Sequence, residues 1–325
     1  MTCELRNFAT LDIGTNSTLL LLAREQADGT LVEDRELFRI TRLGRGLGAT
    51  GRLSPEAVRA TLDAVGEFMA AARAWPLRPL FGVAAATSAV RDAANRADFL
   101  GPCRDLLGCE PRTLDGDEEA QTVFLGAASD RPAGRPVVTI DIGGGSTEVV
   151  AGVPEACRYR VSLDMGCVRF GERFRLYEVA ESADTEAARG AIRETLAGVP
   201  AGVRRAVGGA GGFEVVASGG TATTFAAVEQ ALETYDRGRV HGFVSPAAAV
   251  ESLALRLLGM PSARRAQVPG LEAGRAAVLP AGLLILAEAL RALGAERFTV
   301  TTRGLRFGLA RRLQAGTLDA QWTWG

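Results

Sequence analysis

LDIGTNST at residues 11–18 and IDIGGGST at residues 140–147 are two copies of one short motif. In each copy an apolar run ends in an aspartate, and glycines and small hydroxyl residues follow it, which is typical of a strand that enters a tight loop. Glycines allow the backbone to approach a ligand closely, and loop amides and hydroxyls can donate to phosphate oxygens. A single DIG turn is a common strand end, but two copies in register predict a pair of phosphate-binding loops.

The composition is that of an ordinary globular protein. The 325 residues, enough for two domains, are 47% hydrophobic and 23% charged, and the formal net charge is −1. Such a chain has no global field that attracts nucleic acid or an anionic membrane, so we expect neither as a partner, and a polyanion must be held by a local cluster. The sequence has no lysine, and all 37 basic residues are arginines, which bind phosphate as a planar fork. A GC-rich coding bias explains the missing lysines equally well.

The cysteines and the first residues favour the cytoplasm. The five cysteines are odd in number and show no CxxC spacing, which argues against a zinc site or a disulfide framework. The N-terminus lacks the basic start and long apolar core of a signal peptide. The longest apolar stretch, residues 276–287, is interrupted by Pro280 and Gly282 and is too short to cross a bilayer.

Strands alternate with helices in both halves, which indicates an α/β fold. An Asp-Gly pair at 28–29 predicts a hairpin after the first loop, and Ser54-Pro55 predicts the start of an amphipathic helix. Further strands are predicted at 80–84, 112–114, 215–218 and 297–302, and further helices at 86–95, from 118, at 276–293 and at 305–313.

Pro/Gly-rich segments divide the chain. DRPAGRP at 130–136 predicts a domain boundary, with a first domain over residues 1–130 and a second over 131–303. We expect a C-terminal helix within 304–325 to rejoin the first domain. GGAGG at 208–212 predicts a flexible connection inside the second domain.

Eight sequence blocks carry a family resemblance. In order along the chain they are DIGTNS (12–17), RLGRGL (42–47), ATSAVRDAAN (86–95), GDEEA (116–120), DIGGGSTE (141–148), MGCVRFGERF (165–174), ASGGT (217–221) and RGLRFGL (303–309). With these blocks the chain resembles the short form of the exopolyphosphatase/guanosine pentaphosphate phosphohydrolase (Ppx/GppA) family. The resemblance implies two similar ribonuclease H-like (actin-like) domains of the acetate and sugar kinase/Hsp70/actin superfamily, with the ligand in an interdomain cleft.

Glu118 and Glu119 open a predicted helix, where the helix dipole favours ionised carboxylates. An ionised glutamate beside a bound phosphate can act as the general base that activates water. Acidic residues in a first helical turn are also routine caps. The resemblance implies that Glu119, the second of the pair, is the catalytic base.

The resemblance also implies the ligand-binding residues. The phosphate-binding set is Gly14, Thr15, Asn16, Ser17, Arg91, Gly143, Gly144, Gly145, Ser146 and Thr147, with Thr87 and Ser88 as further donors. Asp141 and Glu148 would bind Mg²⁺ or another divalent cation, with Asp12 as a third ligand, because hard oxygen ligands suit that ion. Glu148 alternatively is a carboxylate on a strand face, and Arg91 alternatively makes an ion pair at a domain interface.

Other motif residues have weaker implications. The turn Ser218, Gly219, Gly220 and Thr221 resembles the one that faces the nucleoside in kinases of the superfamily, and in a polyphosphatase the alternative is that it only shapes the cleft. Five arginines either line a polyanion path or are surface charges: Arg42, Arg45, Arg169, Arg303 and Arg306. We interpret the single histidine, His241, and the thiol of Cys167 as structural.

The activity implied by the resemblance is phosphoanhydride hydrolysis. The enzyme would release terminal orthophosphate from inorganic polyphosphate, or convert pppGpp to ppGpp, or do both. A kinase or ATPase of the same superfamily and a non-catalytic polyphosphate or alarmone sensor are the alternatives. The carboxylates of Glu119, Asp141 and Glu148 argue against the sensor, because a pure anion binder gains nothing from negative charge beside its ligand. Substrate preference, chain-length preference and assembly as a homodimer stay open.

Overall fold

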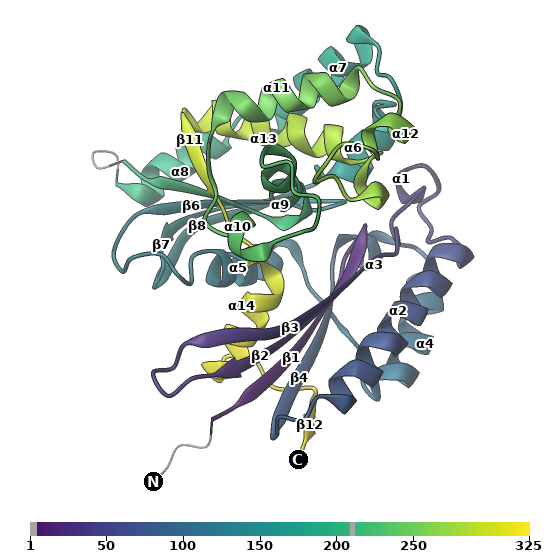
Figure 1. Ribbon diagram of the computed structural model, residues 1–325, viewed down its shortest axis with the longest axis vertical. Helices are drawn as coiled ribbons and strands as arrows, with labels where there is room; N and C mark the ends of the chain where they lie inside the picture. The colour runs from purple at the N-terminus through teal and green to yellow at the C-terminus, as the bar shows by residue number, and fades with distance from the viewer. Residues whose placement is uncertain (1–4, 209–211) are drawn as a thin grey trace. The chain divides into compact units, whose positions relative to one another are not determined.

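The computed structural model describes residues 5–208 and 212–325 (Figure 1). The chain forms two compact units: unit 1 is Met1–Glu118 with Leu305–Gly325, and unit 2 is Glu119–Gly304. The change from one unit to the other at Glu118 falls inside helix α5 (Gly116–Ala127). A domain boundary near residue 130 stays a prediction, and most of the predicted GGAGG connection lies outside the described residues.

Unit 1 is built on one mixed sheet. Its strands are β1 (Asn7–Ile13), β2 (Ser17–Glu25), β3 (Leu31–Ile40), β4 (Leu80–Ala86), β5 (Arg112–Thr113) and β12 (Trp322–Trp324). The first three form an antiparallel meander, β4 pairs parallel to β1, and β5 pairs parallel to β4.

Unit 2 repeats this arrangement. Its strands are β6 (Val137–Ile142), β7 (Thr147–Val153), β8 (Ala156–Leu163), β9 (Glu214–Ser218), β10 (Val244–Pro246) and β11 (Arg297–Val300). A meander of β6, β7 and β8 is followed by β9 parallel to β6 and by β11 parallel to β9. Both units therefore have the strand order 3-2-1-4-5 of a ribonuclease H-like domain, and the predicted α/β class with two actin-like units is confirmed.

Helices cover these sheets. In unit 1 they are α1 (Leu47–Thr50), α2 (Pro55–Ala74), α3 (Ser88–Asp92), α4 (Ala97–Leu107) and α14 (Leu305–Gln314). In unit 2 they are α6 (Cys167–Arg173), α7 (Ser182–Leu196), α8 (Val199–Val207), α9 (Gly219–Glu229), α10 (Arg237–Val240), α11 (Ala247–Leu258), α12 (Ser262–Arg265), α13 (Leu279–Leu293) and the 3-10 turn η1 (Ala273–Arg275). The predicted start of α2 is confirmed, since Ser54 Oγ accepts from the Ala57 amide at 3.2 Å.

Each unit has its own apolar core. In unit 2, residues 279–290 of α13 are all buried and pack against α11, α7 and α6. This helix begins three residues later than predicted, because Pro280 has no N–H and is tolerated only in the first turn. In unit 1, α2 and α4 pack together, and their buried faces join those of β1 and β4.

The C-terminus differs from the sequence prediction. Helix α14 ends at Gln314, and Gly316 has φ +67°, a conformation that favours glycine and follows helix ends. The chain then forms the unpredicted strand β12, which pairs antiparallel with β4. Gly82 of β4 makes this possible, because a Cβ there would lie 1.8 Å from the Trp322 indole.

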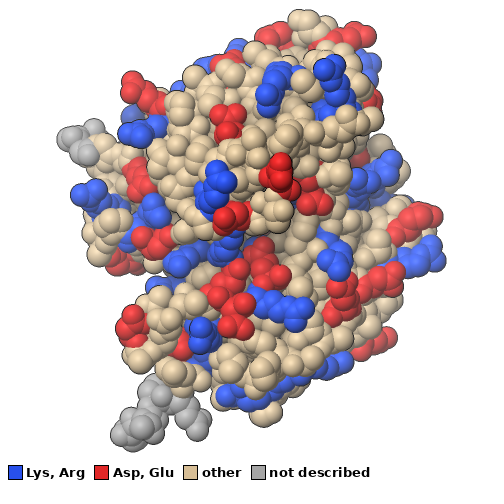
Figure 2. All heavy atoms as spheres, viewed as in Figure 1, with Lys and Arg blue, Asp and Glu red and all other residues tan. Residues whose placement is uncertain are grey.

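The surface carries both signs of charge. Arginines and acidic residues are interspersed on the face seen in Figure 2, consistent with the near-zero net charge. Within residues 5–208 and 212–325, no helix has the length and apolarity needed to cross a bilayer.

Candidate functional site

The second motif copy forms a tight loop between β6 and β7. Asp141 lies in β6, Gly143 to Ser146 form the turn, and Thr147 begins β7. The Gly143 amide donates to the Ser146 carbonyl at 3.0 Å, which closes the turn. The predicted strand and loop are therefore present in this copy.

The carbonyls of Gly143, Gly144 and Gly145 turn toward α6. The Cys167 amide donates to Gly143 O at 3.0 Å, the Val168 and Arg169 amides donate to Gly144 O at 2.9 and 3.1 Å, and Arg169 Nε donates to Gly145 O at 2.8 Å. In a trans peptide the carbonyl of one residue and the amide of the next point in opposite directions. The amides of residues 144–146 therefore point away from α6, and they have no protein acceptor within the described residues. Such a row of aligned amides binds anions.

Gly166 brings α6 close enough to hold the loop. A Cβ at this position would lie 2.4 Å from the carbonyl carbon and oxygen of Gly144 and 2.5 Å from the Gly145 amide nitrogen. Only a residue without a side chain lets the start of α6 approach these backbone atoms.

Three carboxylates of unit 2 interact beside this loop. Glu148 on β7 is only 2% exposed and accepts from Ser162 Oγ at 2.7 Å and from the Ser146 hydroxyl. Burial raises the pKa of Glu148 well above its usual range, and the nearby charges of Glu119 and Asp141 raise it further. Because burial and both neighbouring charges disfavour a further negative charge, the cluster would gain from a bound cation.

The carboxylates of Asp141 and Glu148 are suitable ligands for a magnesium ion. Asp141 and Glu148 supply hard carboxylate oxygens, which Mg²⁺ prefers. No group of three or more His, Cys, Asp and Glu side chains is arranged to hold a metal among the residues that the structure describes. Mg²⁺ keeps several waters and takes ligands from substrate phosphates, so it needs only one or two protein carboxylates.

The two glutamates on α5 have different surroundings. Glu118 makes ion pairs with Arg312 at 2.9 Å and Arg112 at 3.3 Å. Glu119 is buried, with 6% exposure, and its charge acts on Glu148. Glu118 is thus held by two arginines, and Glu119 belongs to the carboxylate cluster.

The third turn also contributes to the unit 2 site. Ser218 ends β9, and its buried hydroxyl has no hydrogen-bond partner within the described residues. Gly219 has φ +81°, and a Cβ there would lie 2.2 Å from Asp141 Oδ1. Asp141 thus lies against the backbone of this turn. The next glycine, Gly220, is covered by the guanidinium of Arg275, and Thr221 lies against α13 at Gly282.

The first motif copy forms the same turn in unit 1. The Gly14 amide donates to Ser17 O at 3.0 Å, and Thr15 Oγ1 lies 2.8 Å from Ser88 Oγ at the start of α3. The amide and carbonyl of the Asn16 side chain are buried and have no partner within the described residues. Asp12 lies at the end of β1, just before this turn.

Arg91 of α3 donates to Leu114 O at 3.0 Å and lies 3.5 Å from Asp92. The Thr87 amide, just before α3, donates to Ile13 O at 3.2 Å. This contact brings the start of α3, with Thr87, Ser88 and Arg91, to the first loop. Their role in phosphate binding stays a prediction.

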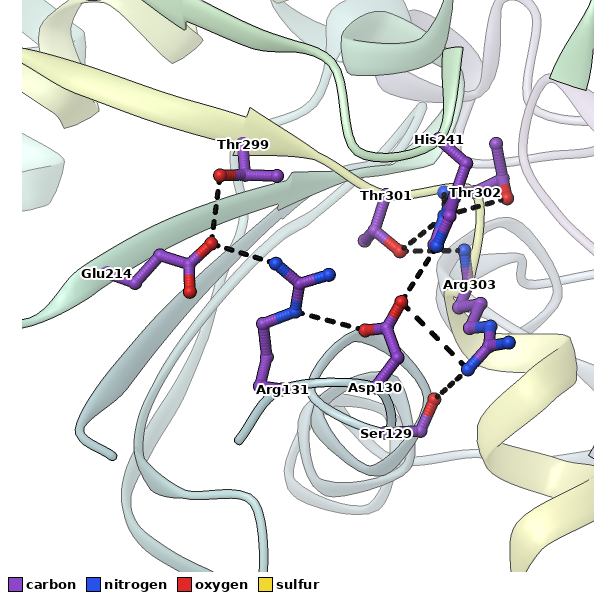
Figure 3. A network of polar contacts seen from close by, with 9 residues as sticks. All are labelled: Ser129, Asp130, Arg131, Glu214, His241, Thr299, Thr301, Thr302 and Arg303. Atoms are coloured by element: carbon purple, nitrogen blue, oxygen red, sulfur yellow. Dashed lines mark hydrogen bonds and ion pairs between the residues drawn. The ribbon is translucent and has the colours of Figure 1, made fainter. Parts of the chain in front are cut away.

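Several predicted polyanion-binding arginines have other contacts. Arg303 Nη1 lies 3.3 Å from Ser129 Oγ and 3.9 Å from Asp130 Oδ2, within the network of Figure 3. Arg306 pairs with Glu36 at 2.7 Å. Arg42 and Arg45 are exposed, so a polyanion-binding role stays a prediction for them.

The contacts of His241 and the burial of Cys167 are those of structural residues. His241 Nε2 lies 2.7 Å from Asp130 Oδ2, and its Nδ1 lies 3.3 Å from the Thr302 amide (Figure 3). The histidine thus joins the end of α5 to the segment that follows β11. Cys167 is buried, and burial raises its pKa to about 11, so the thiol stays protonated at neutral pH.

Sequence reasoning missed Ser162, Gly166 and Arg275. Ser162 reaches Glu148 because the two are cross-strand partners in β8 and β7. The sequence does show Gly166 in the MGCVRF block, but not that it packs against the loop between β6 and β7. Arg275 lies in a 3-10 turn without any pattern that points to Gly220.

These features agree with comparisons to known proteins. The family model described as the Ppx/GppA phosphatase family matches residues 23–314. The chain belongs to this family. Exopolyphosphatase 2 of Mycobacterium tuberculosis is 34% identical to it, and the match covers 95% of this chain and 99% of that protein.

Solved structures of the Ppx/GppA family share the fold. The crystal structure of the Aquifex aeolicus family member is 28% identical, with a TM-score of 0.77 over 96% of this chain and 98% of that one. An exopolyphosphatase from Cytophaga hutchinsonii, 21% identical, has a TM-score of 0.84 over 95% of this chain and 98% of that one, which supports the fold alone.

Proposed function

We propose that this Ppx/GppA protein is a phosphoanhydride hydrolase that releases terminal orthophosphate from inorganic polyphosphate. The observation that carries the proposal is the cluster of two buried carboxylates, Glu119 and Glu148, with the half-buried Asp141, beside a loop whose amides point away from α6. The amide row suits a phosphate, and the carboxylates suit a cation and a base. The relative named exopolyphosphatase 2 supports polyphosphate as the substrate. Conversion of pppGpp to ppGpp is the same reaction on a second substrate.

In the proposed reaction, the amides of Gly144, Gly145 and Ser146 bind oxygens of the terminal phosphoryl group. Glu119 takes a proton from the attacking water as the oxygen–phosphorus bond forms and the anhydride bond breaks. The products are orthophosphate and a polyphosphate one unit shorter. Asp141 and Glu148 would hold Mg²⁺, which when bound supplies positive charge to neutralise phosphate oxygens.

The remaining parts of the proposal concern the unit 1 loop, the cellular location and the assembly of the protein. Gly14, Thr15, Asn16, Ser17 and Arg91 would bind further phosphates, and Asp12 would assist the cation. The cysteine pattern supports a cytoplasmic location. Assembly as a homodimer stays a prediction.

The adjacent glutamates provide a matched test. We expect Glu119→Gln to lower kcat for phosphate release by about 10²- to 10⁴-fold, the usual contribution of a general base. Glu118→Gln, which alters a carboxylate held by two arginines, should keep most of the activity. Binding of polyphosphate to Glu119→Gln, measured by calorimetry, should persist. If Glu119→Gln stays as active as Glu118→Gln, Glu119 is not the base.

A substrate panel separates this proposal from its alternatives. Initial rates are measured with short and long polyphosphate, pppGpp and ATP, with and without Mg²⁺. Release of phosphate from polyphosphate supports the hydrolase. Turnover of ATP alone would make the protein a kinase or ATPase, and tight binding without any product would make it a sensor.

A further inference from the structure

The second loop depends on a side chain where the first uses only backbone. In the first loop, the Gly44 amide donates to Thr15 O at 2.8 Å, and the Thr41 and Arg42 amides donate to Asn16 O at 3.1 and 2.9 Å. The motif register aligns Thr15 with Gly144 and Asn16 with Gly145. The segment after β3 therefore holds the first loop as the start of α6 holds the second.

One carbonyl is held differently in the two copies. Asn16 O accepts from two backbone amides, whereas Gly145 O accepts from the side chain of Arg169 through Nε at 2.8 Å. The Arg169 amide is already used on Gly144 O at 3.1 Å. A single residue thus fixes two successive peptides of the loop.

We propose that Arg169 is a positioning residue for phosphoryl transfer, and this rests on the proposed function. By holding Gly145 O, Arg169 orients the Gly145–Ser146 peptide so that the Ser146 amide points away from α6. This amide is next to the hydroxyl that interacts with Glu148. Arg169 therefore acts through the loop on the phosphate and on the carboxylate cluster.

The surroundings of Arg169 favour this role over general attraction of a polyanion. Its side chain is 30% exposed and lies on the loop, and it also forms an ion pair at 3.9 Å with Asp164, whose side chain is 85% exposed. A residue that only attracts a polyanion needs its charge but not a donor at a fixed position. Lysine keeps the charge and lacks the rigid Nε donor, so Arg169→Lys separates the two roles.

The test measures kcat and KM for Arg169→Lys and Arg169→Ala with a short and a long polyphosphate. We expect both variants to lose roughly 10- to 100-fold in kcat, somewhat less than the loss of a direct oxyanion donor. The loss should be equal for the two chain lengths, because the loop binds only one end of the chain. Guanidinium added to Arg169→Ala should restore part of kcat, which a general loss of folding would not allow.

The matched control is Arg173→Lys. Arg173 lies one turn later on α6, with its guanidinium 4.9 Å from the ring centre of Phe174, and should keep the kcat of the unaltered protein. If Arg169→Lys retains full kcat, or if its only defect is a KM that rises with chain length and salt, the positioning role is wrong and Arg169 is a polyanion contact. Failure of the unaltered protein to release phosphate would instead refute the proposed function. Thermal unfolding of each variant shows whether a lost activity comes from a lost fold.

Discussion

Substituting Gly166 with alanine tests whether the loop must be held against α6. The backbone of Gly166 has φ −143°, which any residue adopts, so the substitution adds a methyl group and no backbone strain. That methyl carbon would lie 2.4 Å from backbone atoms of Gly144, whereas ordinary contacts begin near 3.4 Å. The loop and α6 must therefore separate by about 1 Å.

A shift of this size has a calculable cost. Misplacement by ~1 Å in a catalytic arrangement lowers rates by about 10²-fold, and overpacking costs about 1–3 kcal/mol of stability. We expect Gly166→Ala to lower kcat for phosphate release from polyphosphate about 100-fold while the protein remains folded.

The control is a glycine whose added methyl group meets nothing. A Cβ at Gly190 on α7 would have open space within 4 Å, so Gly190→Ala should keep full kcat and gain about 0.5–1 kcal/mol from helix propensity. Steady-state phosphate release and urea unfolding are measured on both variants. A folded Gly166→Ala protein with kcat within about twofold of the unaltered one would refute the argument that α6 must hold this loop closely.

Two further predictions concern carboxylates of unit 2 that pair with cationic side chains. Burial alone would raise the pKa of Asp130, but hydrogen bonds from His241 and Arg131, with the charges of nearby arginines, hold it well below its ordinary 3.8 (Figure 3). The stability that the ionised form of Asp130 contributes is therefore present above about pH 4 and is lost as the pH falls below that value. We expect Asp130→Asn to reduce this loss of stability at low pH, when the free energy of unfolding is measured against pH. Glu288, 2% exposed, pairs with Arg189 at 2.6 Å, Arg193 at 3.0 Å and Arg291 at 2.6 Å, so Glu288→Gln should cost about 3–5 kcal/mol in urea unfolding. A loss under about 1 kcal/mol would contradict the importance of this network.

The sequence predicted what depends on short segments. The strand, the turn and the glycines of each motif copy are contiguous, so their local structure follows from their own residues. The start of α2 is fixed in the same way by Ser54 and Pro55. The repeated order of strands then followed from the repeated motif.

The residues that complete the site depend on distant parts of the chain. Ser162 reaches Glu148 only through the β7–β8 register, which shifts between Ala151 and Gly152. No local pattern reveals such an irregularity. Likewise, the sequence left Arg169 between a polyanion path and a surface charge, and only its position after β8 shows that it contacts the loop itself.

The neighbouring glutamates of α5 show why the second of them is the better candidate for the base. Successive residues of an α-helix project about 100° apart, so adjacent side chains meet different surroundings. Glu118 projects to Arg112 and Arg312 of unit 1, and the two ion pairs hold its carboxylate there. Glu119 projects into unit 2, where its charge acts on Glu148. A base must be ionised beside a substrate that is itself negative, so it requires a compensating cation, and the carboxylates of Asp141 and Glu148 are where that cation would bind.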